Sequence, residues 1–95
     1  MRVLLVGHDA SLTGAPRLLL GLHKFLEGKP GIEVAVFIAG DGPLLNEHRK
    51  ISKVYRYKPF KTVFGERFTA MLARNSLRRS IRNFNPDCII YNTIV

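Results

Sequence analysis

Three short, continuous apolar runs constrain most strongly what this chain can fold into. They are RVLLVG at residues 2–7, IEVAVFIA at 32–39 and DCIIY at 87–91. A strand that is buried on one face alternates between apolar and polar residues, whereas a strand of a parallel sheet is covered on both faces and is apolar throughout. The chain is therefore predicted to form a parallel β-sheet.

Helical segments are expected between the runs. Pro16 begins the first helix, and the turn residues from Gly28 to Gly31 end it. Its expected apolar face consists of the residues that recur at helical spacing, which are Leu18, Leu19, Leu22, Phe25 and Leu26. After the second run, the turn GDGP places Pro43 near the start of a short helix that runs to about Ile51.

The second half of the chain continues this alternation. Residues 53–57 (KVYRY) are expected to form a third, more exposed strand. A longer helix is predicted over about 65–84, with Asn85 and Pro86 closing it before the last strand. One face of that helix carries an apolar stripe, made of Ala70, Ala73, Leu77, Ile81 and Phe84.

The resulting order, βαβαβαβ, predicts an α/β fold with a Rossmann-like, three-layer parallel sheet. Strand order 3-2-1-4 is the simplest order in which all crossovers are right-handed and helices cover both faces of the sheet. In that order the first and fourth strands are neighbours that the chain reaches from opposite directions, so a crevice is expected between their carboxyl ends. Residues 8–14, Asn92 and Thr93 would line it. The fourth strand is left as a sheet edge, which predicts either a longer natural chain or a homodimer through that edge.

The charge of the chain is concentrated in one segment. Fifteen Lys and Arg against seven acids give a formal net charge of +8, and residues 49–82 contain Glu66 as their only acid. Such a basic block is suited to bind phospholipid headgroups, a phosphorylated substrate or nucleic acid. An equal alternative is that the block is a solvated positive surface with no binding partner. The candidate anionic-surface residues lie on the long helix and are Arg74, Arg78, Arg79 and Arg82. Apolar residues lie near these arginines, namely Phe68, Met71 and Leu72. Such residues beside arginines are typical of a membrane-surface helix, and the alternative is that they pack under residues 58–64.

Cysteine content and the start of the chain indicate a cytoplasmic protein. The single cysteine, Cys88, cannot form an internal disulfide and is expected to be a small buried residue. The apolar run near the start is too short for a membrane span and lacks a signal-peptide pattern. Peripheral contact of the protein with the inner face of the membrane remains an alternative. The chain has one cysteine and three scattered histidines, a set that predicts no metal site.

The loop HDASLTGAP after the first strand is the candidate binding segment. Gly14 allows close approach of the backbone, and the helix that follows points free N–H groups and its positive dipole end toward the crevice. A phosphate or a sugar hydroxyl would fit there, although Ser11 or Thr13 could simply cap the helix. The dinucleotide fingerprint G-x-G-x-x-G is absent. His8 is a candidate substrate contact, whereas His23 and His48 are expected at the surface.

Three segments carry a resemblance to a known family. VLLVGHDASLTGAP, GIEVAVFIAGDGPL and NPDCIIYNT resemble the amino-terminal domain of group 1 glycosyltransferases, which have the GT-B fold of two facing Rossmann-like domains. The resemblance implies that residues 1–95 are the amino-terminal part of an acceptor-side domain, a fragment whose donor-binding domain is absent. It further implies that the full-length enzyme uses a nucleotide-sugar donor, while this chain alone binds no cofactor and is not catalytically competent.

The resemblance also implies site residues. The glycine-containing loop of the family maps onto Thr13, Gly14 and Ala15, and the exit of its fourth strand maps onto Asn92 and Thr93. Many relatives have two glycines where this chain has Gly14 followed by Ala15. The expected function is transfer of a sugar to a glycan or lipid-linked acceptor, as in polysaccharide biosynthesis.

A second function stays open beside this one. In it the chain is a non-catalytic α/β binding module whose basic segment, 49–82, docks anionic lipid or nucleic acid. No nucleic-acid motif or stacking platform is present in that segment, which disfavours nucleic acid. The sugar, the acceptor and the stereochemical outcome of transfer do not follow from the sequence.

Overall fold

A computed structural model of the protein describes residues 1–7, 14–40, 42–57 and 66–92, with side chains for all of these except 66–70. Four strands form one sheet: β1 (Arg2–Gly7), β2 (Glu33–Ile38), β3 (Val54–Arg56) and β4 (Cys88–Asn92). Three helices alternate with them: α1 (Gly14–Glu27), α2 (Leu45–Ile51) and α3 (Glu66–Phe84). The predicted order βαβαβαβ is confirmed.

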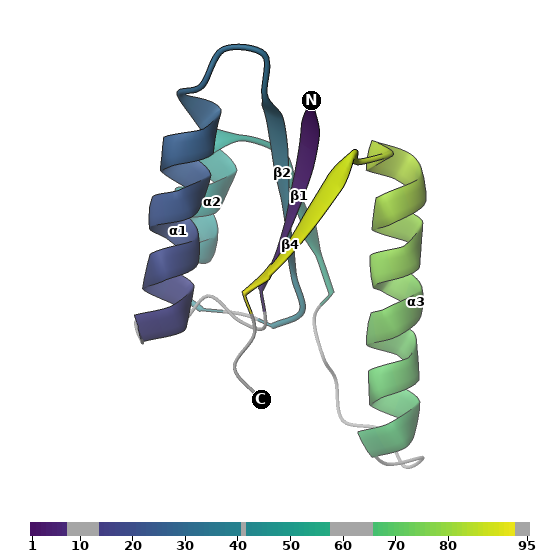
Figure 1. Ribbon diagram of the computed structural model, residues 1–95. Coiled ribbons are helices and arrows are strands. Elements are labelled where there is room, and N and C mark those ends of the chain that lie inside the picture. Colours follow the sequence, from purple (N-terminus) through teal and green to yellow (C-terminus); the bar gives the residue numbers. More distant parts are fainter. Residues whose placement is uncertain (8–13, 41, 58–65, 93–95) are drawn as a thin grey trace.

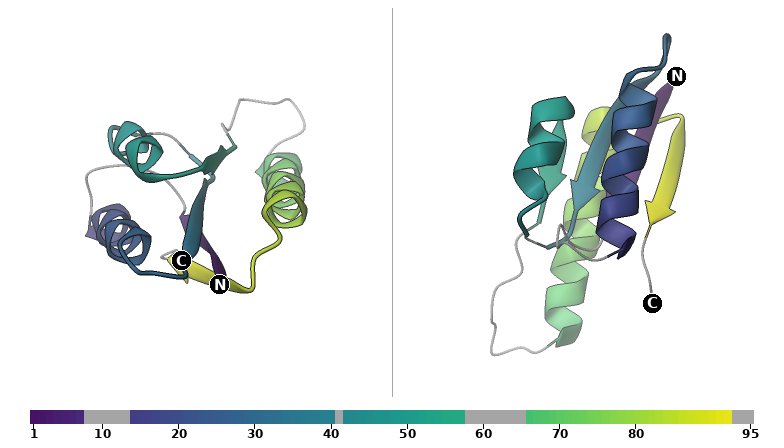
Figure 2. Two further views of the ribbon diagram at one scale, coloured as in Figure 1. Left: turned by 90° about the horizontal axis from the view of Figure 1, so that it is seen from above. Right: turned by 90° about the vertical axis from the view of Figure 1, so that its left-hand side faces the viewer.

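The sheet is parallel throughout and has the predicted order β3-β2-β1-β4. Helices α1 and α2 cover one face, and α3 covers the other (Figure 1). Viewed from above, the sheet stands between the two helical layers, which gives the three-layer arrangement (Figure 2).

Burial of the strands on both faces explains their continuous apolar runs. On β1, Val3 and Leu5 pack against α1 and α2, whereas Leu4 and Val6 face α3. Strand β2 alternates in the same way, so successive residues enter two separate cores. Phe37 is the largest fully buried side chain on the α3 side.

The turn that ends α3 uses Asn85. This residue has a φ of 53°, the left-handed conformation, and its N–H donates to the Ile81 carbonyl at 2.8 Å. Asparagine tolerates this conformation better than most residues and commonly ends helices. The turn directs the chain into β4. Asp87, the residue before that strand, is bonded to β1, since its Oδ2 accepts from the Arg2 N–H at 2.7 Å.

The orientation of α1 differs from the predicted one. Leu19, Leu20 and His23 are its buried residues, whereas Leu18 and Phe25, expected on the apolar face, are exposed. The cause is that the apolar residues of this helix extend over more than one face, so spacing alone did not fix its rotation. Strand β4 lies at the edge of the sheet, as predicted, and Cys88 is half-buried against the α1 side.

Candidate functional site

The carboxyl ends of β1 and β4 meet the start of α1. Gly7 pairs with Asn92 at the end of the β1/β4 ladder, and the Asn92 Nδ2 donates a hydrogen bond of 2.7 Å to the Ala15 carbonyl. This bond ties together two segments that lie 77 residues apart in the sequence. We call Gly7, Gly14, Ala15 and Asn92 the switch-point cluster, because the strand order reverses here.

Gly14 leaves open space in this cluster. It is the first residue of α1, it is exposed, and a Cβ atom built on it would meet no atom within 4 Å. The packing of the protein therefore does not require glycine at this position. The first turn of a helix also presents N–H groups without intrahelical partners, which suit a hydroxyl or an anionic oxygen.

Three of the six predicted substrate-binding residues are thus brought together: Gly14, Ala15 and Asn92. The other three, His8, Thr13 and Thr93, lie outside the described residues, as does Ser11.

The four predicted anionic-surface arginines are all exposed on α3. Arg74, Arg78 and Arg82 follow Met71 at spacings of three, four and four residues, which places these four residues along one side of the helix. Met71 is also exposed, at 45%. We call Met71, Arg74, Arg78 and Arg82 the basic row. Arg79 lies three residues before Arg82, at the border of the row, and it lines a pocket.

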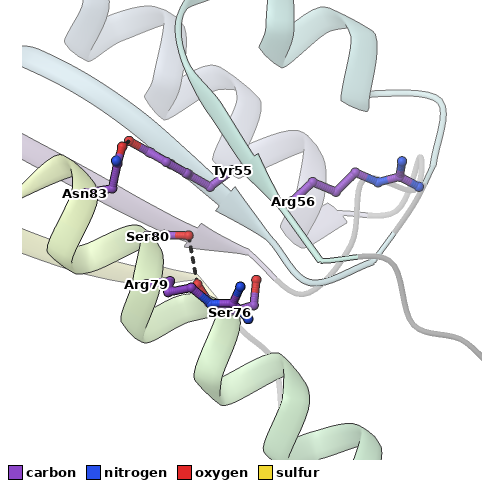
Figure 3. Close-up of a pocket in the computed structure, with 6 residues that line it drawn as sticks. All are labelled: Tyr55, Arg56, Ser76, Arg79, Ser80 and Asn83. Atoms are coloured by element: carbon purple, nitrogen blue, oxygen red, sulfur yellow. Dashed lines mark hydrogen bonds between the residues drawn. The ribbon is translucent and has the colours of Figure 1, made fainter.

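That pocket lies between β3 and α3 and has a volume of about 340 Å³. Tyr55 and Arg56 line it from the strand, and Ser76, Arg79, Ser80 and Asn83 line it from the helix. Figure 3 shows Tyr55 and Asn83 reaching toward each other, while the Arg56 side chain extends from β3 in the opposite direction. We call it the β3/α3 pocket. The sequence suggested no such site, because its two sides are separated in the chain and no motif joins them.

A buried histidine pair lies on the opposite side of the sheet. The sequence predicted His23 and His48 at the surface, and this is wrong: both are 0% exposed. Their rings stack with centroids 5.1 Å apart, and their Nδ1 atoms are 2.8 Å apart. His23 lies four residues after Leu19 and His48 lies four after Leu44, so each follows a buried leucine by one helical turn. That spacing was the signal that could have placed them inside.

The hydrogen bonds assign the protons of this pair. The single hydroxyl proton of Ser52 goes to the Val34 carbonyl at 2.8 Å, so the His23 Nε2–H donates to the Ser52 Oγ at 2.6 Å. The His23 Nδ1 then accepts from the His48 Nδ1–H. Both rings are neutral in this arrangement. Burial, and secondarily the His48 ring, lowers the pKa of His23 to about 4, while burial and the nearby Lys24 lower the pKa of His48.

The described residues gather no group of three or more His, Cys, Asp or Glu that could hold a metal ion. Among the helices of the described part of the chain, none is long and apolar enough to cross a membrane.

Comparison of the chain with protein-family models, with curated proteins and with solved structures gives no significant match. Function therefore has to be inferred from the fold and from the residues described above.

Proposed function

We propose that this chain forms the acceptor-binding side of a nucleotide-sugar-dependent glycosyltransferase. It would bind a glycan or lipid-linked acceptor at the switch-point cluster. A second Rossmann-like domain would hold the sugar nucleotide, so residues 1–95 alone would transfer no sugar. The resemblance of three sequence segments to group 1 glycosyltransferases motivates this function.

One observation carries the proposal: the strand order reverses between β1 and β4, and Asn92 at that point is bonded to the first turn of α1. In open α/β sheets, ligands bind beside the carboxyl ends of the strands where the order reverses. The Asn92 Oδ1 and the N–H groups of the first turn of α1, which have no partner within the helix, are suited to sugar hydroxyls, which both donate and accept hydrogen bonds.

Acceptor binding can be tested by NMR on the ¹⁵N-labelled chain titrated with mono- and disaccharides of glucose, mannose, galactose and N-acetylglucosamine. We expect at least one of these sugars to shift the amide signals of Gly7, Gly14, Ala15 and Asn92. UDP and GDP serve as donor controls and should shift them far less. Sugar-induced shifts confined to α3, or no shift with any of these sugars, would contradict the proposal.

Gly14 provides a variant that separates binding from folding. In Gly14→Ala the added methyl group meets open space in the protein, so stability should be unchanged or slightly higher. The same methyl group should weaken sugar binding by restricting access to the backbone. Gly21→Ala is the matched control, because Gly21 is also in α1 and also has open space around it. It should stabilise the helix by about 1 kcal/mol and leave binding unchanged.

A second candidate function rests on the basic row. Three exposed arginines and an exposed methionine on one side of α3 suit the surface of an anionic membrane, where a basic side chain contributes about 1 kcal/mol to binding. We infer from this row a cytoplasmic protein that contacts the inner face of the membrane peripherally, either as the setting for a lipid-linked acceptor or as a non-catalytic binding module.

Vesicle sedimentation tests the row. The variant Arg74→Gln/Arg78→Gln/Arg82→Gln should lose about 3 kcal/mol of binding to phosphatidylserine vesicles, which is a loss of about a hundredfold. It should keep its thermal stability, since all three side chains are exposed. Unchanged vesicle binding by this variant would exclude the row as the docking face, and equally tight, salt-dependent binding of duplex DNA by the wild type would favour nucleic acid instead.

A further inference from the structure

The β3/α3 pocket is lined by hydrogen-bond donors and by the cation of Arg79. Among the described residues, no carboxylate lines it. We propose that this pocket binds the phosphate group of a small phosphorylated polyol or sugar. The inference does not depend on the glycosyltransferase function, because the pocket shares no residue with the switch-point cluster.

Tyr55 fixes one donor in place. Its hydroxyl donates to the Asn83 Oδ1 at 2.6 Å, and this bond orients the amide. The Asn83 Nδ2 has no protein partner among the described residues, so its two hydrogens are available to a ligand. The Tyr55 ring is itself held by an edge contact with Phe84, with centroids 6.5 Å apart. The donor is therefore positioned before any ligand arrives.

Arg79 supplies the charge. It is exposed, and the described residues form no ion pair with it. A guanidinium group can bind phosphate through two parallel hydrogen bonds. The lining residues of α3 recur at helical spacing, so they lie on the same side of the helix: Ser76, Arg79, Ser80 and Asn83.

Arg56 does not offer its charge to a ligand in the pocket, because its side chain extends away from Tyr55 and its Nε donates to the Gly40 carbonyl at 3.5 Å. Ser80 adds an acceptor. The Ser80 hydroxyl donates to the Ser76 carbonyl at 3.0 Å, so its oxygen offers a lone pair to a ligand hydroxyl. Donors for the phosphate and an acceptor for a hydroxyl together match a phosphorylated polyol better than a bare anion.

The size of the pocket limits the ligand. Small-molecule sites span roughly 300 to 1,000 Å³, and a volume of about 340 Å³ is at the lower end of that range. It fits a phosphate with a short polyol or one sugar ring rather than a dinucleotide. Such a phosphate could come from a free metabolite or from a lipid headgroup.

Titration of the full chain with glycerol 3-phosphate, followed by NMR, tests the site. The wild type should show saturable shifts at Tyr55, Ser76, Arg79 and Asn83. In Arg79→Gln binding should weaken about tenfold or more, because a charge-assisted hydrogen bond is lost. Arg49→Gln is the control, since Arg49 is an exposed arginine of α2 that lies outside both the pocket and the basic row, and it should change affinity less than about twofold. Tyr55→Phe should also weaken binding, since it frees the Asn83 amide while keeping the ring.

Vesicles of phosphatidylcholine with phosphatidic acid distinguish the two sources of phosphate. If Arg79→Gln weakens binding to both glycerol 3-phosphate and these vesicles, the pocket takes a lipid headgroup. If it weakens only glycerol 3-phosphate binding, the ligand is a free metabolite. The proposal is overturned if the wild type binds glycerol 3-phosphate without saturation, if it binds only vesicles, or if Arg49→Gln weakens glycerol 3-phosphate binding as much as Arg79→Gln.

Discussion

At the scale of single residues, the His23 and His48 pair has the most definite chemistry. Each ring is buried, and the chain of bonds from His48 through His23 and Ser52 to the Val34 carbonyl satisfies three of the four ring nitrogens. The fourth, the His48 Nε2, has no hydrogen-bond partner among the described residues. Two neutral rings fit this arrangement, whereas protonation of the His23 Nδ1 would place two N–H groups against each other.

The pair should make stability depend on pH. An unfolded histidine titrates near 6.5 and folded His23 at about 4, so between these values the unfolded chain binds more protons. The free energy of unfolding should therefore be greatest above pH 6.5 and fall as the pH drops toward 4, by about 3 kcal/mol for His23 alone. The lowered pKa of His48 acts in the same direction. Urea unfolding at a series of pH values measures this slope.

The double variant His23→Leu/His48→Leu is the control for that slope. Replacing both partners with apolar groups of similar size leaves neither of them unpaired, and Ser52 keeps its bond to Val34. The variant should fold and lose most of the pH dependence between 6.5 and 4. A slope equal to that of the wild type would show that other groups cause it.

At the scale of the elements, helix α1 shows where periodicity is insufficient. Leucine and phenylalanine residues surround much of the helix, and two sets of them fit helical spacing. Residues 18, 22 and 25 would form one apolar face, and residues 19, 22 and 26 would form another. The sheet selects the second, with Leu19 1% exposed and Leu18 69% exposed. Phe25 stays outside, where its ring lies 4.4 Å from the Lys29 Nζ.

A pair of leucine variants tests this rotation of α1. Leu19→Ala should lower the free energy of unfolding by about 2 to 5 kcal/mol, because it removes contacts from a closed core. Leu18→Ala should change it by less than about 0.5 kcal/mol, because its side chain is already in solvent. Chemical denaturation compares the two directly, and equal losses would mean that α1 is rotated differently.

At the scale of the whole molecule, the candidate sites are separated by the sheet. The histidine pair lies on the α1 and α2 side, the β3/α3 pocket on the α3 side, and the switch-point cluster at the carboxyl ends of the central strands. These groups share no residue. Substitutions in one should therefore add to substitutions in another without coupling, which allows the proposed activities to be tested one at a time.

The sequence by itself determined the strands, the helices and their order. Continuous apolar runs form strands that are buried on both faces, and few chiral arrangements of βαβαβαβ exist. Strand order 3-2-1-4 and the meeting of Asn92 with the start of α1 followed from these two constraints. Only the tertiary structure decided that His23 and His48 are buried partners, and that Arg79 faces a pocket with Tyr55 and Asn83 while Arg74 does not. The physical reason is that periodicity records which residues share a face of one element, whereas a contact between two elements depends on the rotation that packing gives to each.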